Sequence, residues 1–179
     1  MPHFALSAVG RDRPGIVAAV SEALLAHSAN IEDSQMTILR GHFTMVLVVA
    51  TPEGADMGPL RSDLEAARDR LGLEALSLSE IEELAETAKP ISSHMVTLYG
   101  ADHPGIVHAA TAALAERRID ITDLTTQLAE DADPPLYVLM MEISPPPDVD
   151  VDELRSALDT VAREQGVDVT LRPLEQDAL

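Results

Sequence analysis

The chain has 179 residues with 31 acidic and 12 basic side chains, a formal net charge of −19. Such a field repels nucleic-acid phosphates and anionic lipid, and a chain with no Trp, two Phe and two Tyr offers no platform for base stacking. The composition therefore argues against direct nucleic-acid binding and against a membrane partner. Without cysteine there are no disulfides or thiolate sites. No apolar run approaches the roughly 20 residues of a membrane span, so we expect a cytoplasmic protein.

The first half of the chain predicts four strands and two helices. Residues 3–10 are small and apolar, which favours a buried strand. A turn over residues 10–15 follows, with Pro14 placed where a helix would begin, since its missing N–H needs no partner there. The first helical stripe is Ile16, Val20, Ala23, Leu24 and His27.

Residues 31–39 and 42–51 then alternate as two strands around the hairpin Arg40-Gly41. The second helical stripe is Met57, Leu60, Leu64, Ala67 and Leu71. Residues 74–79 are the last predicted strand of this half.

The second half repeats the first. The octapeptide at residues 10–17, GRDRPGIV, recurs ninety positions later as GADHPGIV, and Asn30-Ile31 recurs as Asp120-Ile121. After a small insertion around residues 130–135, four further apolar positions match: Phe43, Met45, Leu47 and Val49 correspond to Tyr137, Leu139, Met141 and Ile143. The helical stripes recur as Ile106, Ala110, Ala113, Leu114 and Arg117, and as Val151, Leu154, Leu158 and Val161. Residues 167–171 predict the final strand.

The element order is therefore strand-helix-strand-strand-helix-strand, twice. With right-handed crossovers this order gives an α+β, ferredoxin-like domain: a four-stranded antiparallel sheet with both helices on one face. We predict domains at residues 1–80 and 92–179, joined by an acidic linker at 81–91. The third strand of each domain is apolar on both sides. Either central strands are simply hydrophobic, or the open face packs on the other repeat or on another subunit.

The repeated turn, with Asn-Ile or Asp-Ile opening the second strand, resembles the ACT domain, and the tandem pair resembles the glycine cleavage system transcriptional repressor group. The resemblance implies a small-molecule ligand, commonly an amino acid, together with a regulatory protein partner and a homo-oligomer. It implies a site between two units, formed by the strand-to-helix turn of one and the start of the second strand of another. The implied residues are Asp12, Pro14, Gly15, Ile16 and Asn30 in the first copy, and Asp102, Pro104, Gly105, Ile106 and Asp120 in the second.

The chemistry of these positions suits an amino acid. A helix start offers unpaired N–H groups to a carboxylate, glycine leaves its backbone accessible, and Asp or Asn accepts a hydrogen bond from an ammonium group. The alternative is a purely structural turn, because Asp-x-Pro-Gly is also a common turn and cap composition. Arg11 and Arg13 make the first turn the better site for a carboxylate, because the second has Ala101 and His103 there.

No catalytic, metal or cofactor site is predicted. The acids at residues 148–152 superficially resemble the Asp-x-Asp motif of haloacid dehalogenase-type phosphatases, but Pro145–Pro147 precede them and a helix follows, which favours capping. His103 and His108 are five residues apart, not on one helix face. We therefore expect a regulator without enzymatic activity. The alternatives are an assembly module without a ligand, or a regulatory subunit of a separate amino-acid-metabolism enzyme.

Overall fold

The computed structural model describes residues 1–82, 91–129, 131 and 135–174, and the chain divides into two compact units at residues 1–86 and 87–179. Most of the predicted linker, residues 83–90, lies outside the described residues, as do residues 130 and 132–134 of the predicted insertion.

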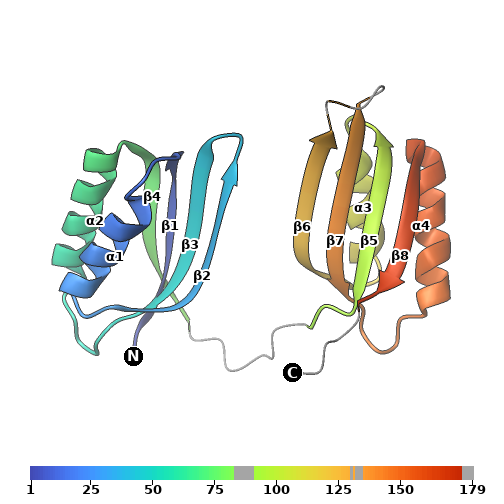
Figure 1. The fold of residues 1–179 in the computed structure, drawn as a ribbon. Helices are drawn as coiled ribbons and strands as arrows, with labels where there is room; N and C mark the ends of the chain where they lie inside the picture. Colours follow the sequence, from blue (N-terminus) through green and yellow to red (C-terminus); the bar gives the residue numbers. More distant parts are fainter. Residues whose placement is uncertain (83–90, 130, 132–134, 175–179) are drawn as a thin grey trace. The chain divides into compact units, whose positions relative to one another are not determined.

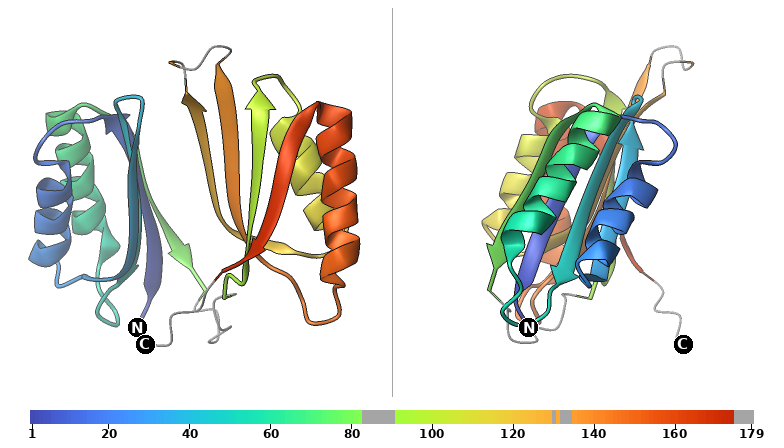
Figure 2. Two further views of the ribbon diagram at one scale, coloured as in Figure 1. Left: turned by 45° about the vertical axis from the view of Figure 1, so that its right-hand side comes forward. Right: turned by 90° about the vertical axis from the view of Figure 1, so that its left-hand side faces the viewer.

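The first unit has the predicted order of elements (Figure 1). They are β1 (His3–Arg11), α1 (Ile16–Ala26), β2 (Asn30–Leu39), β3 (His42–Ala50), α2 (Met57–Leu71) and β4 (Leu73–Ile81). The strands form an antiparallel sheet in the order β2-β3-β1-β4. Figure 2 shows α1 and α2 side by side over one face of this sheet.

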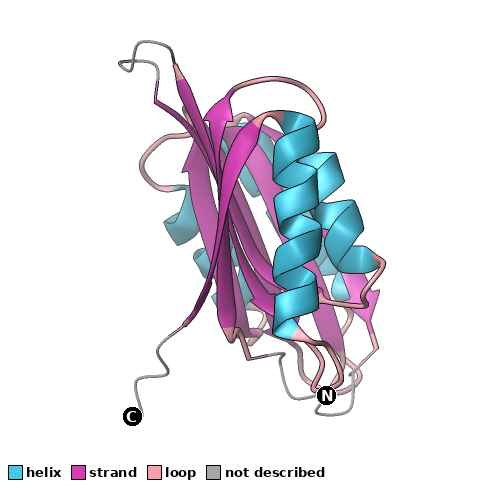
Figure 3. Cartoon of the chain, turned by 90° about the vertical axis from the view of Figure 1, so that its right-hand side faces the viewer, coloured by secondary structure: helices cyan, strands magenta, loops and turns pink. Residues whose placement is uncertain are grey.

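The second unit repeats this architecture. Its elements are β5 (His94–Ala101), α3 (Ile106–Ala115), β6 (Asp120–Ala129), β7 (Leu136–Ser144), α4 (Val151–Gln165) and β8 (Val167–Pro173). The sheet order is β6-β7-β5-β8, again antiparallel, and the helices cover one face (Figure 3). The predicted α+β fold, two ferredoxin-like units in tandem, is confirmed.

Each unit has its own core between helices and sheet. Alternate residues of the central strands face the helices, so β1 buries Phe4, Leu6 and Ala8. The predicted helical stripes supply the other layer, where Leu64 of α2 and Leu158 of α4 are completely buried. The opposite face has no helix over it, and Val46 of β3 is 47% exposed there. What covers this open face stays a prediction.

Three details differ from the expected helix boundaries. His27, expected on the first helical stripe, is instead the C-cap that follows the end of α1 at Ala26. Helix α1 begins at Ile16 rather than Pro14, because Gly15 adopts a left-handed conformation with φ of 97° and becomes the N-cap. Helix α3 ends at Ala115, so Arg117 lies beyond it rather than on its stripe. The capping role expected of the acids at 148–152 is confirmed: the Asp150 carboxylate accepts hydrogen bonds from the Asp152 and Glu153 N–H groups.

Candidate ligand-binding turns

The first strand-to-helix turn is exposed and anchored by its backbone. The Asp12 N–H donates to the Gly41 carbonyl of the β2–β3 hairpin at 2.9 Å. Apart from Gly15 and its two neighbours in the chain, no atom of the described residues lies within 4 Å of the position that a Cβ on Gly15 would occupy. Helix α1 starts without a side-chain cap, so no capping side chain accepts from its first N–H groups. Such a helix start favours an anion, and Arg11 and Arg13 flank it.

The second turn lines a pocket of about 380 Å³, formed by Asp102, His103, Pro104, Gly105, Ile106, Val107 and Tyr137. The structure thus brings together four of the five predicted residues of this copy. Tyr137 and His103 were not among the predicted ligand-binding residues. Tyr137 reaches the pocket from β7, where its backbone is paired in register with Gly100 of β5. The sequence signal for Tyr137 was its match to Phe43, which indicated a core position only.

His103 connects this turn to the end of α4. Its Nδ1 lies 3.1 Å from the Pro104 carbonyl oxygen, and its Nε2 lies 2.7 Å from the Gln165 carbonyl oxygen. Hydrogen bonds to the Pro104 and Gln165 carbonyls, with the nearby Asp102 carboxylate, raise the pKa of His103 above its ordinary 6.5, against the opposing effect of desolvation. In the first unit, Arg13 takes this place: its Nη2 lies 3.1 Å from where a Cβ on Gly72, the C-cap of α2, would be.

Asn30 and Asp120 lie at the opposite end of each sheet from these turns. Asn30 pairs with Ala50 at one end of β3, whereas Arg11, next to the turn, pairs with His42 at the other end. At about 3.3 Å per residue, the two ends are roughly 25 Å apart. In the second unit, Asp120 pairs with Ser144, and Ala101 pairs with Leu136. One unit therefore cannot close a small site from both predicted parts.

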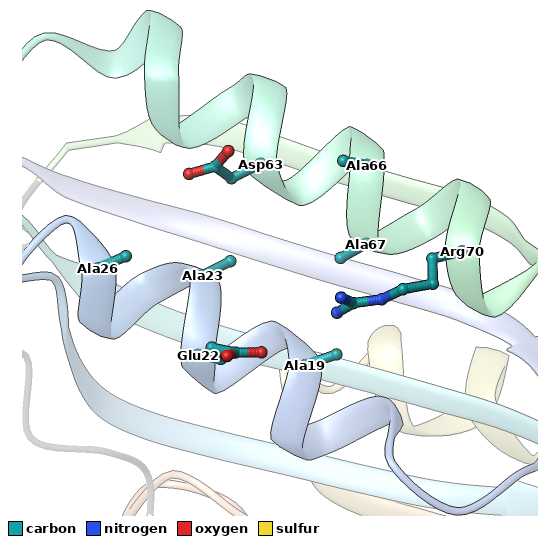
Figure 4. Close-up of a pocket in the computed structure, with 8 residues that line it drawn as sticks. All are labelled: Ala19, Glu22, Ala23, Ala26, Asp63, Ala66, Ala67 and Arg70. Carbon is teal, nitrogen blue, oxygen red and sulfur yellow. The ribbon is translucent and has the colours of Figure 1, made fainter.

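A groove between α1 and α2 was not predicted (Figure 4). It has a volume of about 320 Å³ and is lined by Ala19, Glu22, Ala23, Ala26, Asp63, Ala66, Ala67 and Arg70. The buried alanines Ala19, Ala23 and Ala67 form its floor, and the charged side chains Glu22, Asp63 and Arg70 lie along its rim. The His27 Nε2 lies 2.7 Å from Asp63 Oδ2. The sequence feature that could have indicated this groove is the alanine at positions 19, 23 and 26. Alanines at these positions indicate close helix packing equally well.

A smaller pocket of about 190 Å³ lies between α1 and the edge strand β2. Its lining is mainly apolar and includes Val17, Ile31 and Met36, each at least 39% exposed.

Within the described residues there is no group of three or more His, Cys, Asp or Glu side chains placed to hold a metal ion. Among the same residues, no helix is both long and apolar enough to cross a membrane.

The fold and its repeated turns match a known protein family. The ACT domain family model matches residues 3–76 and 94–172, which include both turns and both second-strand starts. The chain belongs to the ACT domain family, as its repeated motif indicated. Its two domains are of the regulatory ACT type rather than catalytic.

Two relatives show how such units occur elsewhere. The UPF0237 protein MK1213 of Methanopyrus kandleri is 42% identical over 77 residues, covering 42% of this chain and 86% of that protein. A phosphoserine phosphatase of Streptomyces coelicolor is 28% identical over 171 residues, covering 96% of this chain and 40% of the phosphatase. The chain thus spans about two fifths of that enzyme's length.

Two solved structures share the tandem fold. An unknown protein from Galdieria sulphuraria is 30% identical with a TM-score of 0.77, covering 97% of this chain and 98% of that one. A candidate glycine cleavage system transcriptional repressor is 18% identical with a TM-score of 0.73, covering 98% of each chain. At this identity, the second likeness concerns the fold alone.

Proposed function

We propose that this chain is a cytoplasmic amino-acid-binding regulatory protein that acts through contacts with another protein, as part of a homo-oligomer. The ligand-binding residues are Asp12, Pro14, Gly15, Ile16 and Asn30, with Asp102, Pro104, Gly105, Ile106 and Asp120 in the second domain. The regulated process is amino-acid metabolism, with glycine cleavage genes as the first candidate target. Domain boundaries at residues 80 and 92 belong to the same proposal.

The observation that carries the proposal is the first turn. An α-carboxylate suits the uncapped start of α1 beside Gly15, where no side chain blocks the approach. Arg11 brings positive charge close to this turn in a chain of strongly negative net charge, whereas the Arg13 guanidinium lies beside Gly72 at the end of α2. Because Asn30 lies at the far end of the same sheet, a second unit brings its own second-strand start to the turn and supplies the acceptor for the ammonium group.

The test is thermal unfolding of the full chain, followed by circular dichroism, with each of the twenty amino acids added singly. A ligand at one hundred times its dissociation constant stabilises the fold by about 2.7 kcal/mol, which raises the midpoint by several degrees. Asp12→Ala and Asn30→Ala should each abolish the shift. Glu53→Ala, which removes an exposed charge from a loop, is the matched control and should retain it. A chain whose midpoint responds to none of them at millimolar concentration is not an amino-acid sensor.

A second candidate function is an assembly module without a ligand. The observation in its favour is the apolar, exposed surface of β2 and the adjoining start of α1, which includes Ile31, Met36 and Ile38 of β2 and Val17 of α1. This candidate predicts a stable oligomer that is indifferent to all twenty amino acids. Sedimentation measured with and without them separates the two functions.

A third candidate is a regulatory subunit of a separate enzyme. Its support is the match of 96% of this chain to two fifths of a phosphoserine phosphatase. It predicts that a catalytic chain co-purifies with this protein at fixed stoichiometry.

A further inference from the structure

The position two residues before the helix-capping glycine is occupied differently in the two units. It is Arg13 before Gly15, and His103 before Gly105. Both side chains lie at the C-terminal end of their unit's second helix: Arg13 beside Gly72 and His103 on the Gln165 carbonyl. Because this end of a helix carries partial negative charge, a cation is stabilised there. His103 therefore holds its turn to the second helix, and Arg13 lies at the corresponding place in the first unit.

The contacts of His103 require its charged form. Both ring nitrogens face backbone carbonyl oxygens, at 3.1 Å to Pro104 and 2.7 Å to Gln165, and carbonyl oxygens only accept hydrogen bonds. A neutral imidazole has one N–H donor, whereas the imidazolium has two. On loss of the proton, one nitrogen presents a lone pair to a carbonyl, and that contact is lost. Either the Pro104 carbonyl is released or the turn separates from α4.

The groups around the ring support the charged form. On the turn, Asp102 is the charged neighbour and favours the imidazolium. From β7, the phenol of Tyr137 lines the same pocket. In the last turn of α4, the Arg163 guanidinium is directed back along the helix to the Asp159 carbonyl and Thr160 Oγ1, and Glu164 adds a negative charge. The Gln165 side chain also lies over Gly105, where its Oε1 is 3.2 Å from a would-be Cβ.

We infer that His103 is a proton-dependent tether, which holds the turn of the second unit against the end of α4 when charged and loosens that turn when it loses its proton. The first unit does not respond, because a guanidinium stays charged over the whole accessible range. Only one consequence of this inference rests on the proposed function. Because the turn belongs to the proposed ligand site, ligand binding by the second domain weakens as the pH rises.

The test is an NMR pH titration of the isotope-labelled full chain without ligand. In the native protein, the His103 ring should titrate above the ordinary histidine value of 6.5, because both carbonyls stabilise its charged form. The backbone amides of Gly105 and Ile106 should follow the same midpoint, and they should exchange with solvent faster above it.

Two variants make the test specific. His103→Arg keeps the cation at every pH and should abolish the midpoint at Gly105 and Ile106. Arg13→His transfers the tether to the first unit and should create a midpoint at Gly15 and Ile16. Far-UV circular dichroism of both variants establishes that the fold is retained.

The inference is overturned if the His103 ring titrates at or below the ordinary value, or if the Gly105 and Ile106 amides ignore its titration. Because these measurements use ligand-free protein, they are independent of amino-acid binding. A titrating turn without any amino-acid response contradicts the proposed function alone. An amino-acid response without a titrating turn contradicts the tether alone.

Discussion

The two strand-to-helix turns share a left-handed glycine but differ in the side chains around it. Each begins its helix at a left-handed glycine, with φ of 97° at Gly15 and 111° at Gly105. The first turn is joined to the β2–β3 hairpin through the Asp12 N–H, and it is basic. The second is joined to α4 through His103, and it forms a pocket with Tyr137. The comparison teaches that the glycine is required by the backbone, whereas the neighbouring side chains set charge and anchoring.

The helical layers differ in the same way. Counted from the caps, the rim residues of the α1–α2 groove, Glu22, Asp63 and Arg70, correspond to Ala112, Ala157 and Glu164 in the second unit. At these three positions the first unit therefore has mixed charges, and the second unit has one acid. Shared core positions and divergent outer positions indicate that the two units keep one fold while presenting different surfaces.

The largest effect is expected in the cores, where the two units are equivalent. Leu64→Ala and Leu158→Ala each remove a fully buried side chain, and each should cost about 2–5 kcal/mol of unfolding free energy. Chemical denaturation of both variants measures the loss. Costs that differ by more than this range would show that the two cores are not equivalent.

The turn glycines come next. Gly15→Ala and Gly105→Ala each force a side chain into the left-handed region, at a cost of roughly 1–2 kcal/mol. Gly105→Ala should cost somewhat more, because the new methyl group meets Gln165 Oε1 at 3.2 Å. Adding Gln165→Ala to Gly105→Ala should remove that excess. Equal costs for the two single variants would mean that Gln165 moves aside freely.

The aspartate caps of the second helices should differ by a smaller amount. Asp150 accepts from two backbone N–H groups, whereas Asp56 accepts from Gly58 alone. Replacement by Ala should cost about 1 kcal/mol in each case, with the larger loss at Asp150. Asp56→Asn and Asp150→Asn, which keep an acceptor oxygen, are the controls and should lose less. Denaturant midpoints of the four variants provide the measurement.

The smallest effect is expected at the His27–Asp63 contact, which has no counterpart because Asp63 corresponds to Ala157. With Asp63 more than half exposed, Asp63→Ala should cost less than about 1 kcal/mol, and the cost should shrink as salt is added. Thermal midpoints at low and high salt measure it. A loss of unfolding free energy above that limit would show that the groove contributes more to stability than its exposed charges can explain.

The sequence by itself determined the fold class, because periodicity and repetition are local properties. Alternating apolar residues marked strands, the helical stripes marked Leu64 and Leu158 as core, and the ninety-residue offset showed that one unit occurs twice. The repeated turn identified the family. The helix start at Ile16 was displaced from the expected position because Gly15 takes a left-handed conformation that Pro14 did not indicate.

Only the tertiary structure decided how the candidate site residues are distributed. The antiparallel register sends Asn30 to the end of the sheet opposite Asp12, although only seventeen residues separate them along the chain. It also brings His103 onto a carbonyl 62 residues away, at Gln165. Such contacts depend on how strands pair and where the second helix ends, and a local pattern of residue types contains neither.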